Sequence, residues 1–204
     1  LYQGNEGEEK AARTFNYNYA GTGIKTTTVF VYNATSEALE RSTTYRGPVE
    51  GDVTLAITRS VTAYLGNEGE EKAKRTFNYN FAGTGVKTTT VFGYNTSTDA
   101  LERSVTYRGQ ILTVAAEAGA VTRSVTAYSG NEGEEKAQRT FNYNYAGTGI
   151  KTTTVFAYHA TEERLTRSVT YRGEVLAGAG AFTRSVTAYE GNEGEEKAKR
   201  TFNY

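Results

Sequence analysis

Residues 75–92 read Arg-Thr-Phe-Asn-Tyr-Asn-Phe-Ala-Gly-Thr-Gly-Val-Lys-Thr-Thr-Thr-Val-Phe, two strand-forming runs on either side of a glycine-rich turn. The runs at 75–81 and 87–94 are rich in Thr, Val, Tyr and Phe, which favour β-structure. Between them, Ala-Gly-Thr-Gly offers glycine twice for the positive φ angles of a tight turn. This stretch therefore predicts an antiparallel β-hairpin.

The hairpin belongs to a unit that recurs along the chain, an organisation typical of tandem-repeat proteins. The block Gly-Asn-Glu-Gly-Glu-Glu-Lys-Ala begins at Gly4, Gly66, Gly130 and Gly191, offsets of 62, 64 and 61 residues. We place the repeats at 1–58 (N-terminally truncated), 59–122, 123–183 and 184–204 (partial). Because both ends interrupt a repeat, we expect the chain to be a window on a longer array.

Two further runs in each repeat, at 59–64 and 103–108 in the second, also have the composition of strands. Most connections between the runs are too short for a crossover helix, so the sequence predicts an all-β antiparallel meander of hairpins. Four narrow strands cannot bury their own apolar face. We therefore expect the repeats to stack into an elongated β-solenoid-like fibre.

Alternation along the strands predicts which side chains form the core and which residues shape the turns. The predicted core aromatics are Phe15, Tyr17, Phe77, Tyr79, Phe141 and Tyr143, and the predicted turn glycines are Gly21, Gly83 and Gly147. Three arginines at strand starts, Arg13, Arg75 and Arg139, are candidates for salt bridges between repeats. If the Phe77 ring is buried, Phe77→Ala is expected to cost ~3–5 kcal/mol.

The segments that differ between repeats in both length and sequence are 48–57, 110–121 and 174–182. Variation of this kind is typical of surface loops, which often carry binding functions.

Composition excludes several classes of function. The 23 basic residues balance 23 acidic ones, so no electrostatic footprint for nucleic acid is present. A mean hydropathy of −0.59 and the lack of a long apolar run argue against membrane insertion. With one histidine, His159, and no cysteine, neither a catalytic triad nor a thiolate metal site is available, and we expect no catalysis.

Two weaker site hypotheses remain. The carboxylates of Glu68, Glu70 and Glu71 lie in one flexible turn and are of the kind that Ca²⁺ prefers, although nearby basic residues favour a solvated turn. Asn33 and Asn95 begin sequences that fit the N-glycosylation acceptor, and both fall in predicted turns.

The segment Phe15-Asn-Tyr-Asn-Tyr-Ala-Gly21 resembles the motif of Rhs-type YD-repeat proteins, with Asn18 in the Asp position, and it recurs at 77–83 and 141–147. The resemblance implies a large secreted or surface-exposed β-structure of wound hairpins. In that family the repeats build a shell or stalk, and the chemistry resides in other domains.

The sequence as a whole favours a structural repeat of a longer extracellular filament or cell-surface stalk, whose partners are adjacent repeats or copies of the same chain. Two alternatives stay open. One is an adhesin or carbohydrate-binding repeat that uses the variable loops to hold a glycan or cell-surface partner. The other is the wall of a YD-type shell that encloses a toxin.

Overall fold

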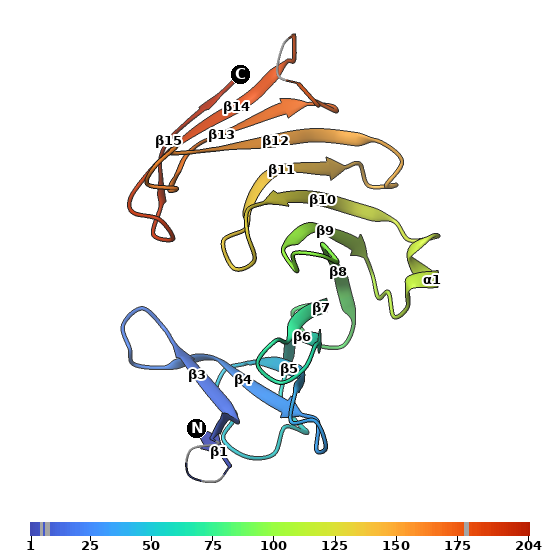
Figure 1. Cartoon of the computed structure of the whole chain (residues 1–204), viewed down its shortest axis with the longest axis vertical. Helices are drawn as coiled ribbons and strands as arrows, with labels where there is room; N and C mark the ends of the chain where they lie inside the picture. Colours follow the sequence, from blue (N-terminus) through green and yellow to red (C-terminus); the bar gives the residue numbers. More distant parts are fainter. Residues whose placement is uncertain (5, 7–8, 178–179) are drawn as a thin grey trace. The chain divides into compact units, whose positions relative to one another are not determined.

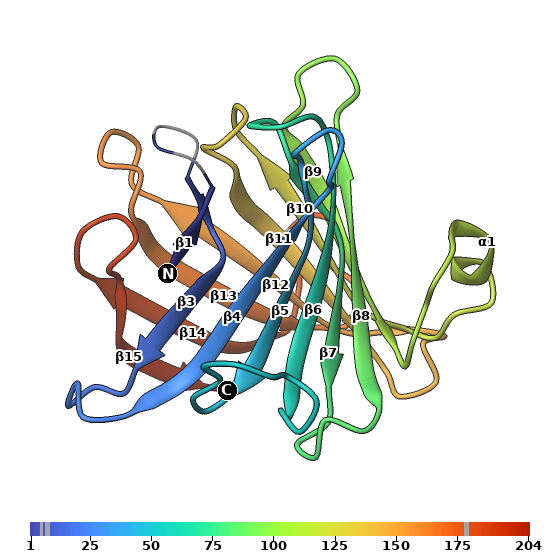
Figure 2. The same ribbon diagram turned by 90° about the horizontal axis from the view of Figure 1, so that it is seen from below.

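The computed structural model describes residues 1–4, 6, 9–177 and 180–204. Nearly all of its regular structure is β-strand, and the predicted all-β antiparallel meander is confirmed. Strands β3 to β15 follow one another in chain order in one sheet, while β1 and β2 form a separate pair (Figures 1 and 2). The chain divides into two compact units, Leu1–Val91 with Arg108–Val114, and Phe92–Tyr107 with Ala115–Tyr204.

The first unit contains the hairpins of the first repeat and the start of the second. Its strands are β1 (Tyr2–Gln3), β2 (Lys10–Ala11), β3 (Arg13–Tyr17), β4 (Ile24–Tyr32), β5 (Leu39–Arg46), β6 (Thr58–Leu65), β7 (Lys72–Tyr79) and most of β8 (Val86–Tyr94).

The second unit contains the later repeats. Its strands are β9 (Leu101–Arg108, except its last residue), β10 (Thr122–Ser129), β11 (Lys136–Tyr143), β12 (Ile150–Tyr158), β13 (Leu165–Arg172), β14 (Thr183–Glu190) and β15 (Lys197–Asn203). The variable loop between β9 and β10 carries the short helix α1 (Val114–Glu117) (Figure 2).

Strand register follows the sequence repeat. Phe77 of β7 lies opposite Val61 of β6 and Thr89 of β8, as the alternating pattern requires. Successive repeats join edge to edge, because the last strand of one pairs with the first strand of the next. The pairs β5–β6 and β13–β14 are examples, with Val169 opposite Val186 in the second. The predicted solenoid-like fibre stays a prediction.

The hairpin turn lies where the sequence placed it, with two corrections. Strand β7 ends at Tyr79, so Asn80 and Phe81, predicted as strand, belong to the turn. Asn80 explains this end: its Oδ1 accepts a hydrogen bond from the Thr84 N–H at 3.0 Å, which turns the chain. The first glycine, Gly83, has a φ of 72°, but Gly85 does not adopt the left-handed region.

The most deeply buried side chains are threonines, not the predicted aromatics. Thr27, Thr89 and Thr153 are 0% exposed. The Thr89 Oγ1 donates to the Gly109 carbonyl at 2.8 Å and accepts from the Ile111 N–H at 3.0 Å. The hydroxyl thus fastens the start of the variable loop over the sheet, and its hydrogen bonds allow a polar group to be buried.

The aromatics predicted for the core are less buried. Phe15, Phe77, Phe141, Tyr79 and Tyr143 are half-buried, and Tyr17 is 58% exposed, so its assignment to the core is wrong. Apolar residues from the variable loops take the buried positions instead: Val49, Ile111 and Val175 are 6–8% exposed. The first residues of each variable loop are therefore part of the core, and only the later residues lie on the surface as predicted.

Among the described residues, no helix has the length and apolar character that crossing a membrane would require.

Candidate functional site

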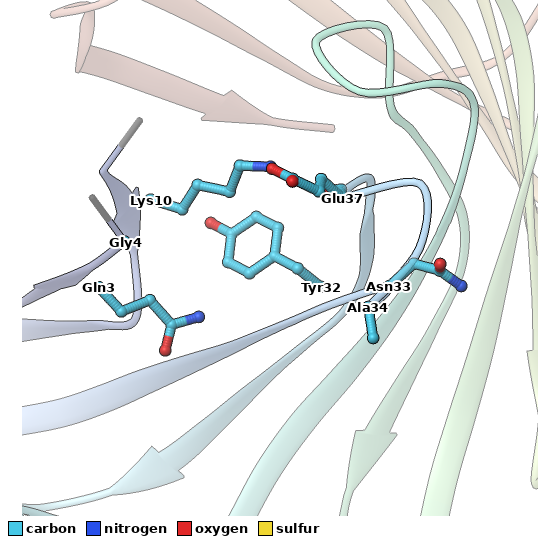
Figure 3. Close-up of a pocket in the computed structure, with 7 residues that line it drawn as sticks. All are labelled: Gln3, Gly4, Lys10, Tyr32, Asn33, Ala34 and Glu37. Carbon is cyan, nitrogen blue, oxygen red and sulfur yellow. The ribbon is translucent and has the colours of Figure 1, made fainter. Parts of the chain in front are cut away.

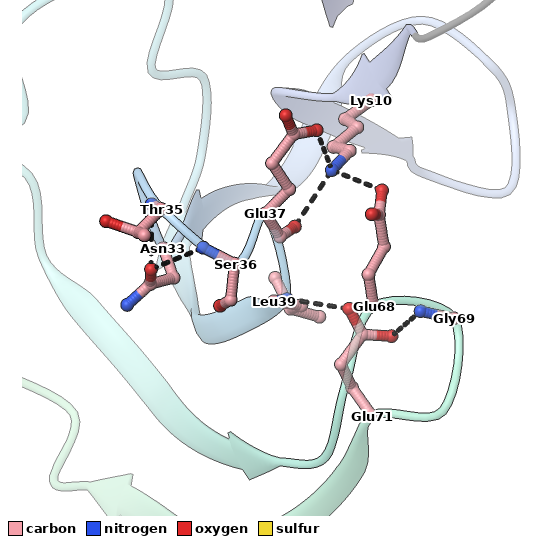
Figure 4. A network of polar contacts seen from close by, with 9 residues as sticks. All are labelled: Lys10, Asn33, Thr35, Ser36, Glu37, Leu39, Glu68, Gly69 and Glu71. Carbon is pink, nitrogen blue, oxygen red and sulfur yellow. Dashed lines mark hydrogen bonds and ion pairs between the residues drawn. The ribbon is translucent and has the colours of Figure 1, made fainter.

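A cluster of charged and polar groups lies where the first repeat meets the second (Figure 4). Lys10 of β2 is at its centre. Its Nζ pairs with Glu37 Oε2 at 2.8 Å and with Glu68 Oε1 at 2.5 Å. Glu37 belongs to the β4–β5 turn of the first repeat and Glu68 to the β6–β7 turn of the second. One lysine therefore bridges two repeats. We call Lys10, Glu37, Leu39, Glu68 and Glu71 the junction cluster.

Glu71 completes the junction cluster with two hydrogen bonds to main-chain amides. Its Oε1 accepts from the Leu39 N–H at 2.7 Å, across the repeat boundary. Its Oε2 accepts from the Gly69 N–H at 3.0 Å, within its own turn. The carboxylate therefore holds the turn in shape and attaches it to the first strand residue of β5.

The same contacts recur in later repeats. Lys136 Nζ pairs with Glu163 at 2.5 Å and with Glu193 at 2.8 Å. The Leu101 and Leu165 N–H groups donate at 2.7 Å to the carboxylates that correspond to Glu71, those of Glu135 and Glu196. The junction is thus a repeated structural device.

A tyrosine–serine pair adds a contact across each boundary between repeats. The Tyr64 and Ser42 hydroxyls are 3.0 Å apart, and the equivalent pairs Tyr128–Ser104 and Tyr189–Ser168 are each 3.2 Å apart. Ser42, Ser104 and Ser168 are all buried. The hydrogen bond therefore satisfies a buried hydroxyl at every junction.

The ion pairs shift the pKa values of their members. Desolvation lowers the pKa of Lys10, but hydrogen bonds and attraction from Glu37 and Glu68 outweigh it, so the pKa of Lys10 is raised. The hydrogen bond from Lys10 lowers the pKa of Glu37. The Leu39 N–H hydrogen bond is the main cause of the lowered pKa of Glu71. All three groups are thus held in their charged forms.

An open pocket of about 380 Å³ lies beside the cluster, lined by Gln3, Gly4, Lys10, Tyr32, Asn33, Ala34 and Glu37 (Figure 3). The Tyr32 hydroxyl donates to the Ala11 carbonyl at 3.0 Å, and the Lys10 Nζ is 5.5 Å from the centre of the Tyr32 ring. An equivalent pocket of about 300 Å³ contains Lys136, Tyr158 and Glu163. In both, the lysine is already bound by carboxylates of the protein, which fits a structural role.

Two of the three candidate calcium ligands bind other groups of the protein. Glu68 binds Lys10, and Glu71 binds two amides, while Glu70 is exposed. Among the described residues, no group of three or more His, Cys, Asp or Glu side chains is placed to hold a metal ion.

The two possible glycosylation sites lie in the β4–β5 and β8–β9 turns. The Asn33 Oδ1 accepts from the Thr35 and Ser36 N–H groups at 2.9 Å, and its Nδ2 donates to Glu40 at 2.7 Å. Asn95 repeats this arrangement, with Nδ2 on Glu102. In the third repeat, the His159 Nδ1 accepts from the Glu162 N–H at 3.2 Å and takes the place of the asparagine oxygen. Glycosylation stays a prediction.

The strand-start arginines, for which the sequence predicts salt bridges, bind carbonyls of the variable loops. Arg13 Nη1 donates to the Val49 carbonyl at 2.7 Å, and Arg139 Nη2 donates to the Leu176 carbonyl at 2.9 Å. Arg75, 5% exposed, donates to the Leu112 carbonyl. Each arginine thereby attaches a variable loop to the sheet.

Sequence reasoning did not identify the junction cluster. Lys10, Glu68 and Glu71 lie within the block that locates the repeats, whereas Glu37 lies outside it. The available signal is the position of Glu37. An acidic residue recurs four places after Asn33, Asn95 and His159, as Glu37, Asp99 and Glu163. Each of these acidic residues follows the lysine of its repeat at the same distance along the chain. Such a constant separation indicates an ion pair that forms in every repeat.

No protein-family model matches this chain, and no curated protein matches it. A solved structure that it resembles is the crystal structure of a protein of unknown function from Bacteroides fragilis. The two are 9% identical over 87% of this chain and 91% of that chain, with a TM-score of 0.16. Nothing about function follows from this likeness.

Proposed function

We propose that the chain is a structural repeat segment of a longer extracellular filament or cell-surface stalk, without a catalytic role. The observation that carries the proposal is the repetition of the junction contacts. The lysine bridge at Lys10 returns at Lys136, and the glutamate–amide bond of Glu71 returns at Glu135 and Glu196.

Contacts of this kind suit a load-bearing array. Each junction combines main-chain pairing between strand edges with side-chain bonds that cross the same boundary, as between β5 and β6. In such arrays, stability comes from the repeats themselves and from the interfaces between nearest neighbours. Adding repeats should therefore lengthen and stabilise the assembly.

The test compares the 204-residue chain with versions lengthened by one and by two further copies of residues 123–183. We expect the denaturation midpoint to rise with repeat number and then level off. Electron cryomicroscopy should show particles whose length grows by a constant increment. Midpoints independent of repeat number, with globular particles, would contradict a filament.

A second candidate function, an adhesin that binds glycans through its variable loops, is favoured by an exposed apolar side chain in each of the three loops. Leu55, Leu112 and Leu176 are 95%, 63% and 68% exposed. Exchange of one loop for another would abolish binding on a glycan array if the loops hold the ligand. If the parent chain binds no glycan, or if loop exchange leaves binding unchanged, the adhesin function is contradicted and the structural function remains. The toxin-enclosing shell stays a prediction from the YD-type resemblance.

A further inference from the structure

Charge is unevenly distributed between the two ends of the strands. In an antiparallel meander, successive connections lie at alternate ends of the sheet (Figure 2). In the first unit, we call residues 18–25, 46–59, 80–87 and 108–114 the loop end, and residues 9–10, 32–41 and 64–74 the turn end. The turn end has six acidic and four basic residues. The loop end has two acidic residues, Glu50 and Asp52, and five basic ones, Lys25, Arg46, Arg59, Lys87 and Arg108.

Exposed apolar side chains lie at the same basic end. Leu55 is 95% exposed, Phe81 is 82% exposed and Ile57 is 44% exposed. Single apolar residues on a surface are common, but several that lie together mark an interaction site. The loop end therefore combines two properties, positive charge and exposed apolar surface.

The apolar residues lie together because the β7–β8 turn packs on the end of the variable loop. A Cβ added at Gly83 would lie 3.0 Å from Ile57 Cγ2 and 2.9 Å from the Thr58 nitrogen. The turn also contacts the end of β5, since the Arg46 guanidinium is 4.9 Å from the centre of the Phe81 ring. We call the following five residues the loop-end patch: Arg46, Leu55, Ile57, Arg59 and Phe81.

The exposure of Leu55 is fixed by hydrogen bonds within the loop. The Thr54 N–H and hydroxyl both donate to Asp52 Oδ1, at 2.9 and 2.5 Å. The Ala56 N–H donates to the Val53 carbonyl at 3.0 Å. These bonds close a turn around Leu55 and use the carboxylate of one of the two acidic residues at this end. The leucine is thus held in solvent by an ordered turn.

The second unit repeats the arrangement. A Cβ added at Gly147 would lie 3.0 Å from Val121 Cγ1, so the β11–β12 turn also packs on the end of a variable loop. Tyr145 of that turn is 85% exposed, and Val121 is 38% exposed. Arg123, at the position of Arg59, is exposed as well. An apolar and basic patch is therefore a property of the repeat.

We propose that the loop end docks on the surface of a bilayer that contains anionic lipids. Arg46 and Arg59 require anionic groups, whereas Leu55 and Phe81 require an apolar region directly beside them. The headgroup layer of an anionic bilayer supplies both, because phosphate groups lie next to the ends of the acyl chains. Side chains at the loop tips would enter this layer, and the arginines would remain at the level of the headgroups.

Other anionic partners match only part of the patch. The turn end of a second copy supplies carboxylates, but its hairpin turns, Asn-Ala-Thr-Ser-Glu-Ala at 33–38 and Gly-Asn-Glu-Gly-Glu-Glu at 66–71, are largely polar. An acidic polysaccharide would pair with the arginines and leave the aliphatic Leu55 without a partner. The lipid surface is the partner that uses both properties, and the excess of carboxylates at the turn end would orient the chain with its loop end toward the bilayer.

Cosedimentation of the 204-residue chain with vesicles tests the proposal, which goes beyond the structural function and does not depend on it. One set of vesicles is phosphatidylcholine alone, and the other contains about 30% phosphatidylserine. We expect binding to the anionic vesicles to be about tenfold stronger or more at low salt, and to weaken as salt rises to about 0.5 M. Equal binding to both sets, or to neither, would overturn the proposal.

Matched variants locate the contact. Leu55→Ser should weaken binding to anionic vesicles about fivefold or more, because the apolar side chain is lost. Leu65→Ser is the control, since Leu65 is 56% exposed at the turn end, and binding should stay within about twofold. Arg59→Gln should weaken binding about threefold or more, whereas Arg41→Gln, an exposed arginine of the turn end, should not. Equal effects at the two ends would overturn the proposal.

Two further outcomes would assign the loop end to another partner and overturn the proposal. If Arg59→Gln weakens binding and Leu55→Ser does not, the patch recognises anions by charge alone, as an acidic polysaccharide would require. If the chain forms dimers without vesicles and Arg59→Gln disrupts them, the loop end binds a second copy. Because repeat number is constant in these measurements, none of the outcomes affects the test of the filament.

Discussion

The carboxylate of Glu71 accepts a 2.7 Å hydrogen bond from the main-chain N–H of Leu39, which belongs to the preceding repeat. A side chain from a turn thereby binds the first residue of a strand 32 positions earlier. Because Glu135 and Glu196 do the same, the turn that marks each repeat in the sequence is also the element that fastens it to its neighbour.

The Glu71→Gln substitution tests this attachment. The glutamine side chain can still accept from one of the two N–H groups, but its NH₂ group faces the other donor. We therefore expect the free energy of unfolding to fall by about 1 kcal/mol. Glu70→Gln, in the same exposed turn, is the control and should change stability by less than about 0.5 kcal/mol. Urea denaturation measures both. Equal effects of the two variants would show that the amide bonds do not stabilise the junction.

Stability should fall in acid. The hydrogen bonds to Glu71 and Glu196 lower the pKa values of these carboxyls below the ordinary value of 4.5. A group whose pKa is lower in the folded state stabilises the fold above its unfolded pKa, and loses this contribution as the pH falls through its folded pKa. We expect the denaturation midpoint to be steady from about pH 7 to 5 and to decline below about pH 4.5. The decline should be shallower in Glu71→Gln. A midpoint that is constant down to pH 3 would contradict these assignments.

The buried threonines are accessible to an isosteric test. In Thr27→Val the shape is kept, but the Gly47 carbonyl and the Val49 N–H both lose their partner, the Thr27 Oγ1. The free energy of unfolding should fall by about 2–4 kcal/mol, since two buried polar groups remain unsatisfied. Thr14→Val, on the exposed side of β3, is the control and should be nearly neutral. Comparable denaturation midpoints for the two variants would show that the buried Thr27 hydroxyl does not stabilise the fold.

Local pattern made the strands and turns predictable. The alternation in Arg75–Tyr79, the glycine at 83 and the block repeat sufficed to predict the antiparallel meander of hairpins. These features depend on residues that are close in sequence, or on the repetition itself.

The core and the junction cluster were harder to predict because both depend on contacts between distant residues. The alternation along the strand places Phe77 on the apolar face and predicts that it is buried, but a single sheet leaves much of each face open, and the ring is half-buried. Ile111 is buried because the variable loop folds back onto Thr89. A recurring apolar residue two places after Gly47, Gly109 and Gly173, in otherwise variable loops, was the available signal.

The loop residue Ile111 should contribute more to the free energy of unfolding than the strand aromatic Phe77, and this difference can be measured. Ile111→Ala removes a side chain that is 8% exposed and should cost about 2–4 kcal/mol. Phe77→Ala removes a half-buried ring and should cost about 1–2 kcal/mol, less than the sequence alone suggests. The comparison uses one denaturant series for both variants. A larger loss for Phe77→Ala than for Ile111→Ala would restore the aromatic core that the sequence predicts.

The lysine bridge should respond to salt and to alkali. Lys136→Gln removes the pairs with Glu163 and Glu193 and should lower the denaturation midpoint, whereas Lys151→Gln, an exposed lysine of β12, should not. The difference between these variants should shrink from low salt to about 1 M, where charges are screened within about 3 Å. Because the pKa of Lys136 is raised in the folded state, its contribution is complete below the ordinary value of 10.5 and is lost as the pH rises through the folded pKa. A difference that persists unchanged in high salt would assign the effect of Lys136 to packing of its aliphatic chain against Tyr158, whose ring centre is 5.8 Å from Nζ.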